Sequence, residues 1–365
     1  ERARAAVSAP WGFCGRGHFF CNFEMLRTSV LLVAGAAVAN AAGAGSWNYD
    51  RCDAINGPAD WTDLCQGSEQ SPINLCGAVN LPLSASISQT NFDQMINTDL
   101  TRDGGVKFVV GNDALTSSVG QVPQFLGRST GTDDVTWNLE QAHFHWGRTN
   151  LDEEGSEHYM ENFQYPLEIH FVHYNSKYAD VTAAVTSGNS DALMVIGQMF
   201  KLQDDSTIGE EPESLTKLGN AIDAARRQGK ENVDLSITPA ELLDTTGGFY
   251  TYAGSLTTPT CNPVVTWINL AKPMMVSTTT LKRFQDVQAG DVTIADHGNY
   301  RNLMPLGSRI LYKSGDEVIS YPCPNRGVVE PAWEGCATSG AASLSAAFVA
   351  PVVAALATIA AAFRL

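Results

Sequence analysis

The sequence has little positive charge. It contains 23 lysines and arginines against 39 aspartates and glutamates, which gives a formal net charge of −16 at pH 7. Such a chain repels a phosphate backbone, so we predict no nucleic-acid partner. Hydrophobic residues make up 44% of the sequence and charged residues 17%. This composition excludes wholesale disorder, collagen and coiled coil, and it favours a globular protein.

Several catalytic signatures are also missing. The chain has no HExxH motif of the zinc proteases, no GxSxG nucleophile elbow and no P-loop lysine. Its eight cysteines include no CxxC pair, which argues against a zinc ribbon. Because disulfides persist in oxidising compartments, the cysteines instead favour a secreted protein. No N-x-S/T sequon occurs, so N-glycosylation is not expected.

The N-terminal part of the chain carries a targeting pattern. Residues 25–41 combine an early arginine, an apolar run and small residues at Ala39 and Ala41, as a signal peptide does. Residues 1–24 do not fit this pattern, and either translated leader sequence or an extra targeting region would explain them. We therefore expect the protein to enter the secretory pathway and to reach the extracellular space, the cell surface or a periplasmic space.

In the tail, residues 316–365, the stretch from Ala337 to Phe363 has no charge, and its last part is apolar. Small residues near Ser339 and Gly340, a short Ser/Ala spacer and an apolar tail resemble a GPI-attachment signal. A transmembrane helix is the main alternative, although the alanine-rich composition, Pro351 and marginal length argue against it. A buried core helix is the third. Membrane attachment through the C-terminus is thus expected, and the oligomeric state stays open.

No repeat, low-complexity block or long linker interrupts residues 47–315, so we predict one domain there. Runs rich in β-formers recur at 106–110, 135–139, 167–174, 193–200 and 264–270, and turn signals separate several of them. Two segments have helical features: the apolar spacing over 215–225, and Ser277 as a cap for a helix through Phe284. The sequence predicts a mainly β fold.

Five of the seven histidines fall between positions 143 and 173. His143 and His145 are two apart on a strand-like segment, so both imidazoles point to one face. His170 and His173 are three apart on a second strand, so only one of them can join the first pair. Three neutral imidazoles on adjacent strands can hold Zn²⁺ tetrahedrally, with a fourth position for water. A lone histidine would more simply be a core residue, but this set indicates a catalytic zinc site.

Several blocks of the sequence resemble the signatures of the α-class carbonic anhydrases. They are QAHFHWG, GSEHYMENFQYPLEIHFVHYN and YAGSLTTPTCNPVVTWINL, preceded by WNYDRCDAINGPADW and SEQSPINL. These blocks occur in order and at suitable spacing within the segment 47–314. The resemblance implies a single domain with a large, mostly antiparallel twisted central sheet and short peripheral helices.

The resemblance also implies an activity: reversible hydration of CO₂ to bicarbonate and a proton by zinc-bound hydroxide, with one Zn²⁺ per chain. His143, His145 and His170 would be the ligands, and His158 and His173 structural core residues. A catalytically silent binding domain on the same scaffold is the first alternative. A metal-dependent esterase is the second.

The family pattern assigns supporting roles around the ligands. Gln141 and Glu168 would hold the first and the third ligand, fixing their tautomers. Thr257 would accept the proton of the zinc-bound hydroxide in a hydrogen bond, and Glu157 would receive the threonine's own proton. This chain would aim a lone pair at the substrate.

The resemblance implies a dry, apolar pocket for CO₂ beside the metal. By composition alone the apolar members would be plain core residues. Tyr49 would belong to the water network of the active site. The pocket residues would be Val172, Val195, Leu256, Thr257, Thr258 and Trp267.

Secreted members of the family join two matching segments by a disulfide, which implies the pair Cys65 and Cys261. Cys52–Cys76 and Cys323–Cys336 are further candidate pairs that the sequence does not settle.

The sequence departs from the family at one position. Fast members carry a histidine partway into the cavity that shuttles the proton to buffer. The best alignment places Gly105 there, and only His297 remains outside the zinc ligands, the core blocks and the N-terminal segment. We therefore expect proton release to limit turnover more severely than in relatives that have this histidine.

Overall fold

The computed structural model describes residues 47–53, 55–82, 84–101, 106–109, 115–128, 135–149, 151–287 and 292–315. The expected signal peptide, the segment before it and the C-terminal tail lie outside these residues. The same holds for Gly105, Cys323 and Cys336. Along the part of the chain that is described, no helix has the length and hydropathy needed to cross a membrane.

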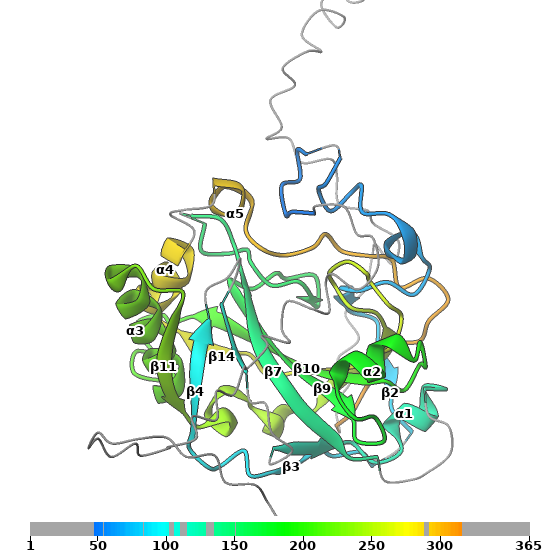
Figure 1. Ribbon diagram of the computed structural model, residues 1–365. Coiled ribbons are helices and arrows are strands. Elements are labelled where there is room, and N and C mark those ends of the chain that lie inside the picture. Colours follow the sequence, from blue (N-terminus) through cyan, green and yellow to red (C-terminus); the bar gives the residue numbers. More distant parts are fainter. Residues whose placement is uncertain are drawn as a thin grey trace, which may run out of the picture.

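A curled sheet of 13 strands forms the body of the fold (Figure 1). In spatial order its main path is β11 (Asn232–Ile237), β4 (Ile96–Thr101), β5 (Val106–Val109), β7 (Trp137–Trp146), β9 (Leu167–Asn175), β10 (Leu193–Leu202), β13 (Val265–Leu270), β12 (Phe249–Gly254), β15 (Tyr312–Lys313) and β2 (Val79–Asn80). Beside this path, β14 (Met274–Val276) pairs with β10, and β6 (Thr116–Ser118) pairs with β3 (Ser88–Thr90) and β7. β1 (Asn74–Leu75) and β8 (Tyr159–Met160) form a separate parallel pair.

Most strand pairs of the large sheet are antiparallel. The exceptions are the pairs β10–β13, β10–β14 and β15–β2, which are parallel. The predicted mainly β domain with a mostly antiparallel sheet is therefore confirmed. The five β-rich runs noted in the sequence correspond to β5, β7, β9, β10 and β13.

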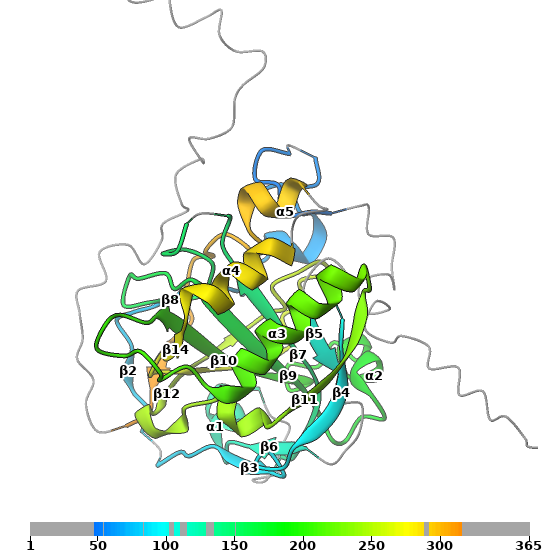
Figure 2. The same ribbon diagram turned by 90° about the vertical axis from the view of Figure 1, so that its left-hand side faces the viewer.

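The helices are short and peripheral (Figure 2). They are α1 (Val122–Phe125), α2 (Val181–Thr186), α3 (Glu213–Gln228), α4 (Thr278–Asp286) and α5 (Val292–His297), with 3₁₀ turns at Asp63–Gln66, Pro239–Leu242 and Thr245–Gly247. Both predicted helices are present. α3 ends at Gly229, whose φ of 61° suits a residue without a side chain. α4 begins after Ser277, whose side chain accepts from Thr280 N at 3.1 Å.

The strand register sorts the central residues onto two faces. On the first, which we call the site face, Glu168, His170 and Val172 of β9 lie opposite residues 199, 197 and 195 of β10. The second, the helix-covered face, carries Phe171 and Ile169. Their side chains share a buried cluster with apolar residues of α3 and α4. One face is thereby left for chemistry, while the other is covered by apolar packing.

A bulge in β7 decides which of its residues reach the site face. The pairing of β7 with β9 shifts register between Leu139 and Gln141. Before the shift, Leu139 lies opposite His173 on the helix-covered face, and after it Gln141 lies opposite Val172 on the site face. A regular strand would place residues 139 and 141 on the same face. The extra residue therefore turns the segment 141–145 toward the site.

Candidate metal centre

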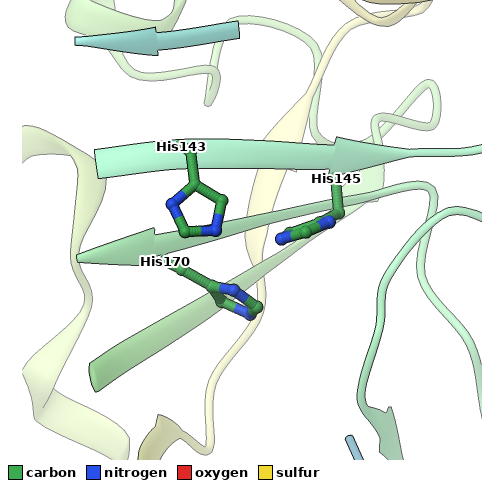
Figure 3. A group of neighbouring side chains, drawn as sticks. All are labelled: His143, His145 and His170. Atoms are coloured by element: carbon green, nitrogen blue, oxygen red, sulfur yellow. The ribbon is translucent and has the colours of Figure 1, made fainter. Parts of the chain in front are cut away.

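β7 and β9 bring three histidines together on the site face (Figure 3). His143 lies directly opposite His170, and His145 is two residues further along β7. The ring centroids are 5.2 Å apart for His143 and His170, and 4.6 Å apart for His145 and His170. One ring nitrogen from each residue lies within 4.8 Å of the other two. His173, the other candidate in the sequence, is on the helix-covered face.

Each of the three imidazoles has one nitrogen directed at an oxygen acceptor. Amide, carbonyl and carboxylate oxygens accept hydrogen bonds, so the nitrogen facing each must carry the proton in a neutral imidazole. The lone pair then lies on Nε2 of His143, Nε2 of His145 and Nδ1 of His170. The three contacts are His143 Nδ1 to Gln141 Oε1 at 3.0 Å, His145 Nδ1 to Asn299 O at 2.8 Å and His170 Nε2 to Glu168 Oε1 at 2.7 Å.

The residues present fit a zinc ion. His145 Nε2 is buried and has no hydrogen-bond partner among the described residues. Burial lowers the pKa of His145, and the charge of Glu157 offsets this only in part, so the imidazole stays neutral, as a metal ligand must. With Zn–N bonds of about 2.0–2.1 Å, tetrahedral ligands stand about 3.4 Å apart. The 4.8 Å limit on the three nitrogens is compatible with that spacing.

Glu168 holds two histidines at once. It is fully buried, and its Oε1 accepts from His170 Nε2 at 2.7 Å and from His158 Nδ1 at 2.9 Å. Its Oε2 accepts from the backbone N of His158 at 2.9 Å. Burial alone would raise the pKa of Glu168, but His170 and His158 more than reverse this and hold it well below its usual range. An ionised carboxylate therefore fixes the ring of His170.

The second histidine of this network, His158, is fully buried, and both its ring nitrogens have partners. Its Nδ1 is engaged by Glu168, and its Nε2 is 2.8 Å from the hydroxyl of Tyr252. His158, Glu168 and His170 also lie close enough together to hold a metal ion. Their hydrogen bonds to one another occupy the atoms that would bind it.

The segment that follows α5 supplies partners that the sequence did not suggest. The carbonyl of Asn299 accepts from His145, while its side chain accepts from Trp146 N at 2.7 Å and donates to Phe144 O at 2.9 Å. The backbone N of Arg301 donates to Glu157 Oε1 at 2.9 Å. Main-chain groups make the decisive contacts here, and every residue type has those groups. The only signals in the sequence were an amide and a guanidinium two positions apart, Asn299 and Arg301.

An apolar wall stands beside the three histidines on the site face. Val172, Val195 and Trp267 occupy neighbouring register positions on β9, β10 and β13, and all three are buried. The rings of Trp267 and His170 have centroids 4.8 Å apart. Leu256 is partly buried and packs against the same cluster. The structure thus brings the four predicted apolar pocket residues together next to the histidines.

The sequence model of the eukaryotic-type carbonic anhydrase family matches residues 56–315. The chain belongs to this family. The α-class carbonic anhydrase resemblance is therefore confirmed, and the family relationship implies a zinc-dependent lyase-type site with CO₂ and bicarbonate as small-molecule substrates. The matched segment contains all three histidines and the apolar wall.

The loop between β12 and β13, residues 255–264, contains Thr257 and Thr258, and we call it the threonine loop. Its Leu256 packs against the apolar wall. Thr257 is 6% exposed and Thr258 is half-buried, just after β12. The expected hydrogen bond from Thr257 to Glu157 is not among the contacts of the described residues. Glu157 Oε2 is buried without a hydrogen-bond partner there, 3.5 Å from His145 Nε2 and 3.9 Å from His170 Nδ1. The Thr257–Glu157 link therefore stays a prediction.

Tyr49 lies in an aromatic cluster near the start of the described chain. Its ring is 5.5 Å from that of Trp47 and 6.0 Å from that of Trp61, centroid to centroid. Burial raises the pKa of Tyr49 well above its ordinary value, and the charge of Glu157 adds to this, while Arg301 opposes it. The phenol therefore stays protonated. Its predicted place in a water network is not tested by these contacts.

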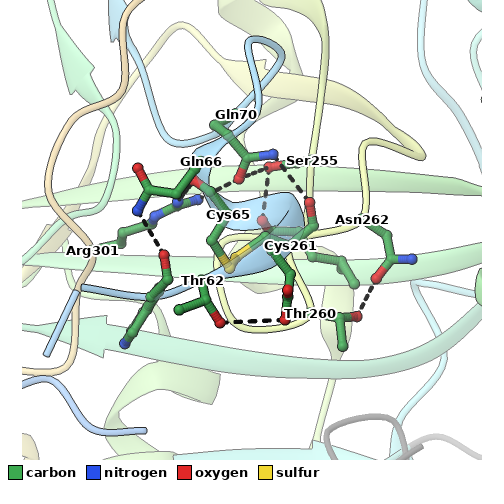
Figure 4. Close-up of a disulfide and its surroundings, with 12 residues drawn as sticks. Thr62, Cys65, Gln66, Gln70, Ser255, Thr260, Cys261, Asn262 and Arg301 are labelled. Atoms are coloured by element: carbon green, nitrogen blue, oxygen red, sulfur yellow. Dashed lines mark hydrogen bonds between the residues drawn. A yellow bond between two sulfur atoms is a disulfide. The ribbon is translucent and has the colours of Figure 1, made fainter. Parts of the chain in front are cut away.

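The disulfide Cys65–Cys261 is present and ties the N-terminal 3₁₀ turn to the threonine loop (Figure 4). Gln70 Nε2 donates to Cys261 O at 3.1 Å, and the guanidinium of Arg301 donates to Cys65 O and to Gln70 Oε1, both at 2.8 Å. A disulfide bond of this kind indicates an oxidising, extracellular-type compartment. Cys52 and Cys76 are also disulfide-bonded.

His297, the histidine that the sequence left without a role, ends α5. Its Nε2 is 3.0 Å from Asp50 Oδ1, which joins α5 to the N-terminal segment. Asp50, Cys52 and His297 form another group of metal-ligating residue types. Because Cys52 is in a disulfide, it has no thiolate to offer a metal.

Proposed function

We propose that the protein is a carbonic anhydrase that interconverts CO₂ and bicarbonate. The observation that carries this proposal is the set of three converging imidazoles, two of them buried and one partly buried, whose tautomers are each fixed by an oxygen acceptor. One zinc ion would be held by His143 Nε2, His145 Nε2 and His170 Nδ1. When bound, zinc supplies a Lewis acid that lowers the pKa of a water ligand to about 7 and so provides a nucleophile at neutral pH.

The surrounding residues would orient the reactants and exclude water. Val172, Val195, Leu256 and Trp267 offer an apolar surface on which CO₂ can rest next to the histidines without displacing hydrogen bonds. Thr258 borders the same space. The wall favours an apolar substrate, because a charged one would lose its hydration there without compensation.

Thr257 and Glu157 would control the direction of one proton. Thr257 Oγ1 can accept a hydrogen bond from the attacking oxygen only if its own proton points elsewhere. Glu157 Oε2 is buried and lacks a hydrogen-bond partner among the described residues, so it is available to accept that proton. With both hydrogen bonds formed, the attacking lone pair would point at the carbon of CO₂.

Zinc content and stopped-flow CO₂ hydration test this proposal together. The wild-type protein should bind one zinc ion and hydrate CO₂. His170→Ala should lose both properties, because the substitution removes one zinc ligand and its hydrogen bond to Glu168. Thr257→Ala should keep the zinc and lose about 100-fold in kcat/KM, since orientation rather than metal is removed.

Three results would each contradict one part of this proposal. A wild-type protein that binds zinc but does not hydrate CO₂ would instead be the catalytically silent binding domain. Full activity of His170→Ala would refute the ligand assignment. Unchanged efficiency of Thr257→Ala would refute the proton link alone.

We further propose that the protein is secreted and held at the cell surface by a GPI anchor. The disulfide, the signal-peptide pattern of residues 25–41 and the apolar tail support this placement. A phosphatidylinositol-specific phospholipase should release the protein from membranes. Retention after this treatment, with an intact C-terminal peptide in mass spectrometry, would show a spanning tail instead.

A further inference from the structure

Asn269 is a buried polar residue that the proposed mechanism does not use. It lies in β13 within the run VVTWINL, and it is 1% exposed. Neither Oδ1 nor Nδ2 has a hydrogen-bond partner among the described residues. A buried amide without partners is unfavourable, so its position calls for a physical explanation.

The strand register places Asn269 in line with a proposed zinc ligand. Asn269 lies opposite Gly197 of β10, and Gly197 lies opposite His170 of β9. Gly197 has no side chain, so the side chains of its neighbours can enter the space where a Cβ would stand. A Cβ built there would be 2.4 Å from Asn269 Oδ1 and 3.2 Å from Glu168 Oε1. The amide of Asn269 and the carboxylate of Glu168 thus reach toward the same space above Gly197.

Glu168 has room for one more donor. Its Oε1 accepts two hydrogen bonds and its Oε2 one, all from His158 and His170. A carboxylate offers about four lone-pair sites, so the open one lies on Oε2. The two orientations of an amide have nearly the same shape, so a half-turn of the Asn269 side chain places Nδ2 where Oδ1 now lies. That turn would present a donor to the carboxylate.

We propose that Asn269 is a positioning residue that donates its amide hydrogen directly to Glu168. It would complete the set of hydrogen bonds that fixes this carboxylate and, through it, the ring of His170. Gly197 would be the residue that makes room for the contact. The consequence for metal binding rests on the proposed zinc site, whereas the contact itself does not.

Zinc release is the first test. Groups in direct contact with a metal ligand typically contribute about 10- to 100-fold to metal affinity, and Asn269 acts one step further out. Asn269→Leu keeps the volume and removes the donor, so zinc should dissociate to a chelator about 3- to 10-fold faster than from the wild type.

Thr266→Val is the matched control. Thr266 is on the same strand but on the helix-covered face, it is fully buried, and its hydroxyl also lacks a partner among the described residues. Its replacement removes an unsatisfied polar atom without touching Glu168, so the zinc dissociation rate should match that of the wild type.

Nuclear magnetic resonance of the zinc-free protein is the second test, and it does not depend on the proposed function. The Nδ2 protons of Asn269 should show a through-space contact with His170 Nε2–H or His158 Nδ1–H in the wild type. The Nε2–H signal of His170 should shift in Asn269→Leu and not in Thr266→Val.

Two results would overturn the inference. In the first, Asn269→Leu has the zinc dissociation rate of the wild type and an unshifted His170 Nε2–H signal, and its thermal unfolding midpoint rises as much as that of Thr266→Val. The Asn269 amide would then be only an unsatisfied buried group. In the second, the wild type shows no through-space contact between the Nδ2 protons of Asn269 and the ring N–H of His170 or His158. A wild-type protein that binds no zinc would refute the proposed function. The through-space contact in the zinc-free protein would still test the inference about Asn269.

Discussion

His173 should make the protein sensitive to mild acid. Its imidazole is fully buried on the helix-covered face, stacked on Phe92 with ring centroids 6.1 Å apart. Nδ1 donates to Phe171 O at 2.9 Å, so Nε2 is the acceptor for the Ser117 hydroxyl at 3.1 Å. Burial lowers the pKa of His173 from 6.5 to about 4, against the smaller opposing effect of backbone contacts.

The size of the effect follows from the two pKa values. In the unfolded chain His173 titrates near its ordinary 6.5, so below that pH the unfolded state takes up a proton that the folded state refuses. Stability therefore falls as the pH drops from 6.5 toward 4. The full difference of about 2.5 in pKa corresponds to about 3.4 kcal/mol, at about 1.36 kcal/mol per pKa unit. Near pH 5 about 2 kcal/mol of this should already be lost.

Urea unfolding of the zinc-free protein near pH 5 and near pH 7 measures this loss. His173→Gln is the variant to compare, because glutamine does not titrate and can still donate and accept hydrogen bonds. Between the two pH values the wild type should lose about 2 kcal/mol more in its free energy of unfolding than the variant. Each protein serves as its own reference, so a constant cost of the substitution cancels. Equal losses in both proteins would refute the reasoning.

Two further predictions concern the disulfide and the proton. Replacing Cys65 and Cys261 by serine opens a loop whose ends are 196 residues apart; the free energy of unfolding should fall by about 5 kcal/mol in the chain-entropy description. A fall below about 1 kcal/mol would contradict that description. If no histidine shuttles the proton, turnover should rise with the concentration of small imidazole buffers, and Gly105→His should raise it without changing kcat/KM for CO₂. High turnover that is insensitive to buffer would show that another group carries the proton.

The fold class and its main elements could be predicted because their signals are local. The β-rich runs became strands, and the apolar spacing of 215–225 became the buried stripe of α3. Ser277 caps α4 because a hydroxyl three residues before a free backbone N–H satisfies it wherever the helix lies. Such patterns depend on near neighbours in the chain, so the sequence alone contains them.

The choice among the histidines needed more than alternation. Spacing placed His143 and His145 on one face and showed that only one of His170 and His173 could join them. The resemblance to the carbonic anhydrases selected His170. Tertiary structure decides it physically, because the register between β7 and β9 brings His170 directly opposite His143 and leaves His173 on the other face.

The sequence by itself determined the mainly β fold, the paired histidines and, through its family blocks, the Cys65–Cys261 bond. Only the tertiary structure decided that Asn299 and Arg301 hold His145 and Glu157, that a bulge turns β7 toward the site, and that Asn269 faces Glu168 across a glycine. The reason is physical. These contacts join residues distant in sequence, or use main-chain atoms that every residue has. They form only when the strands pair, so no local sequence pattern predicts them.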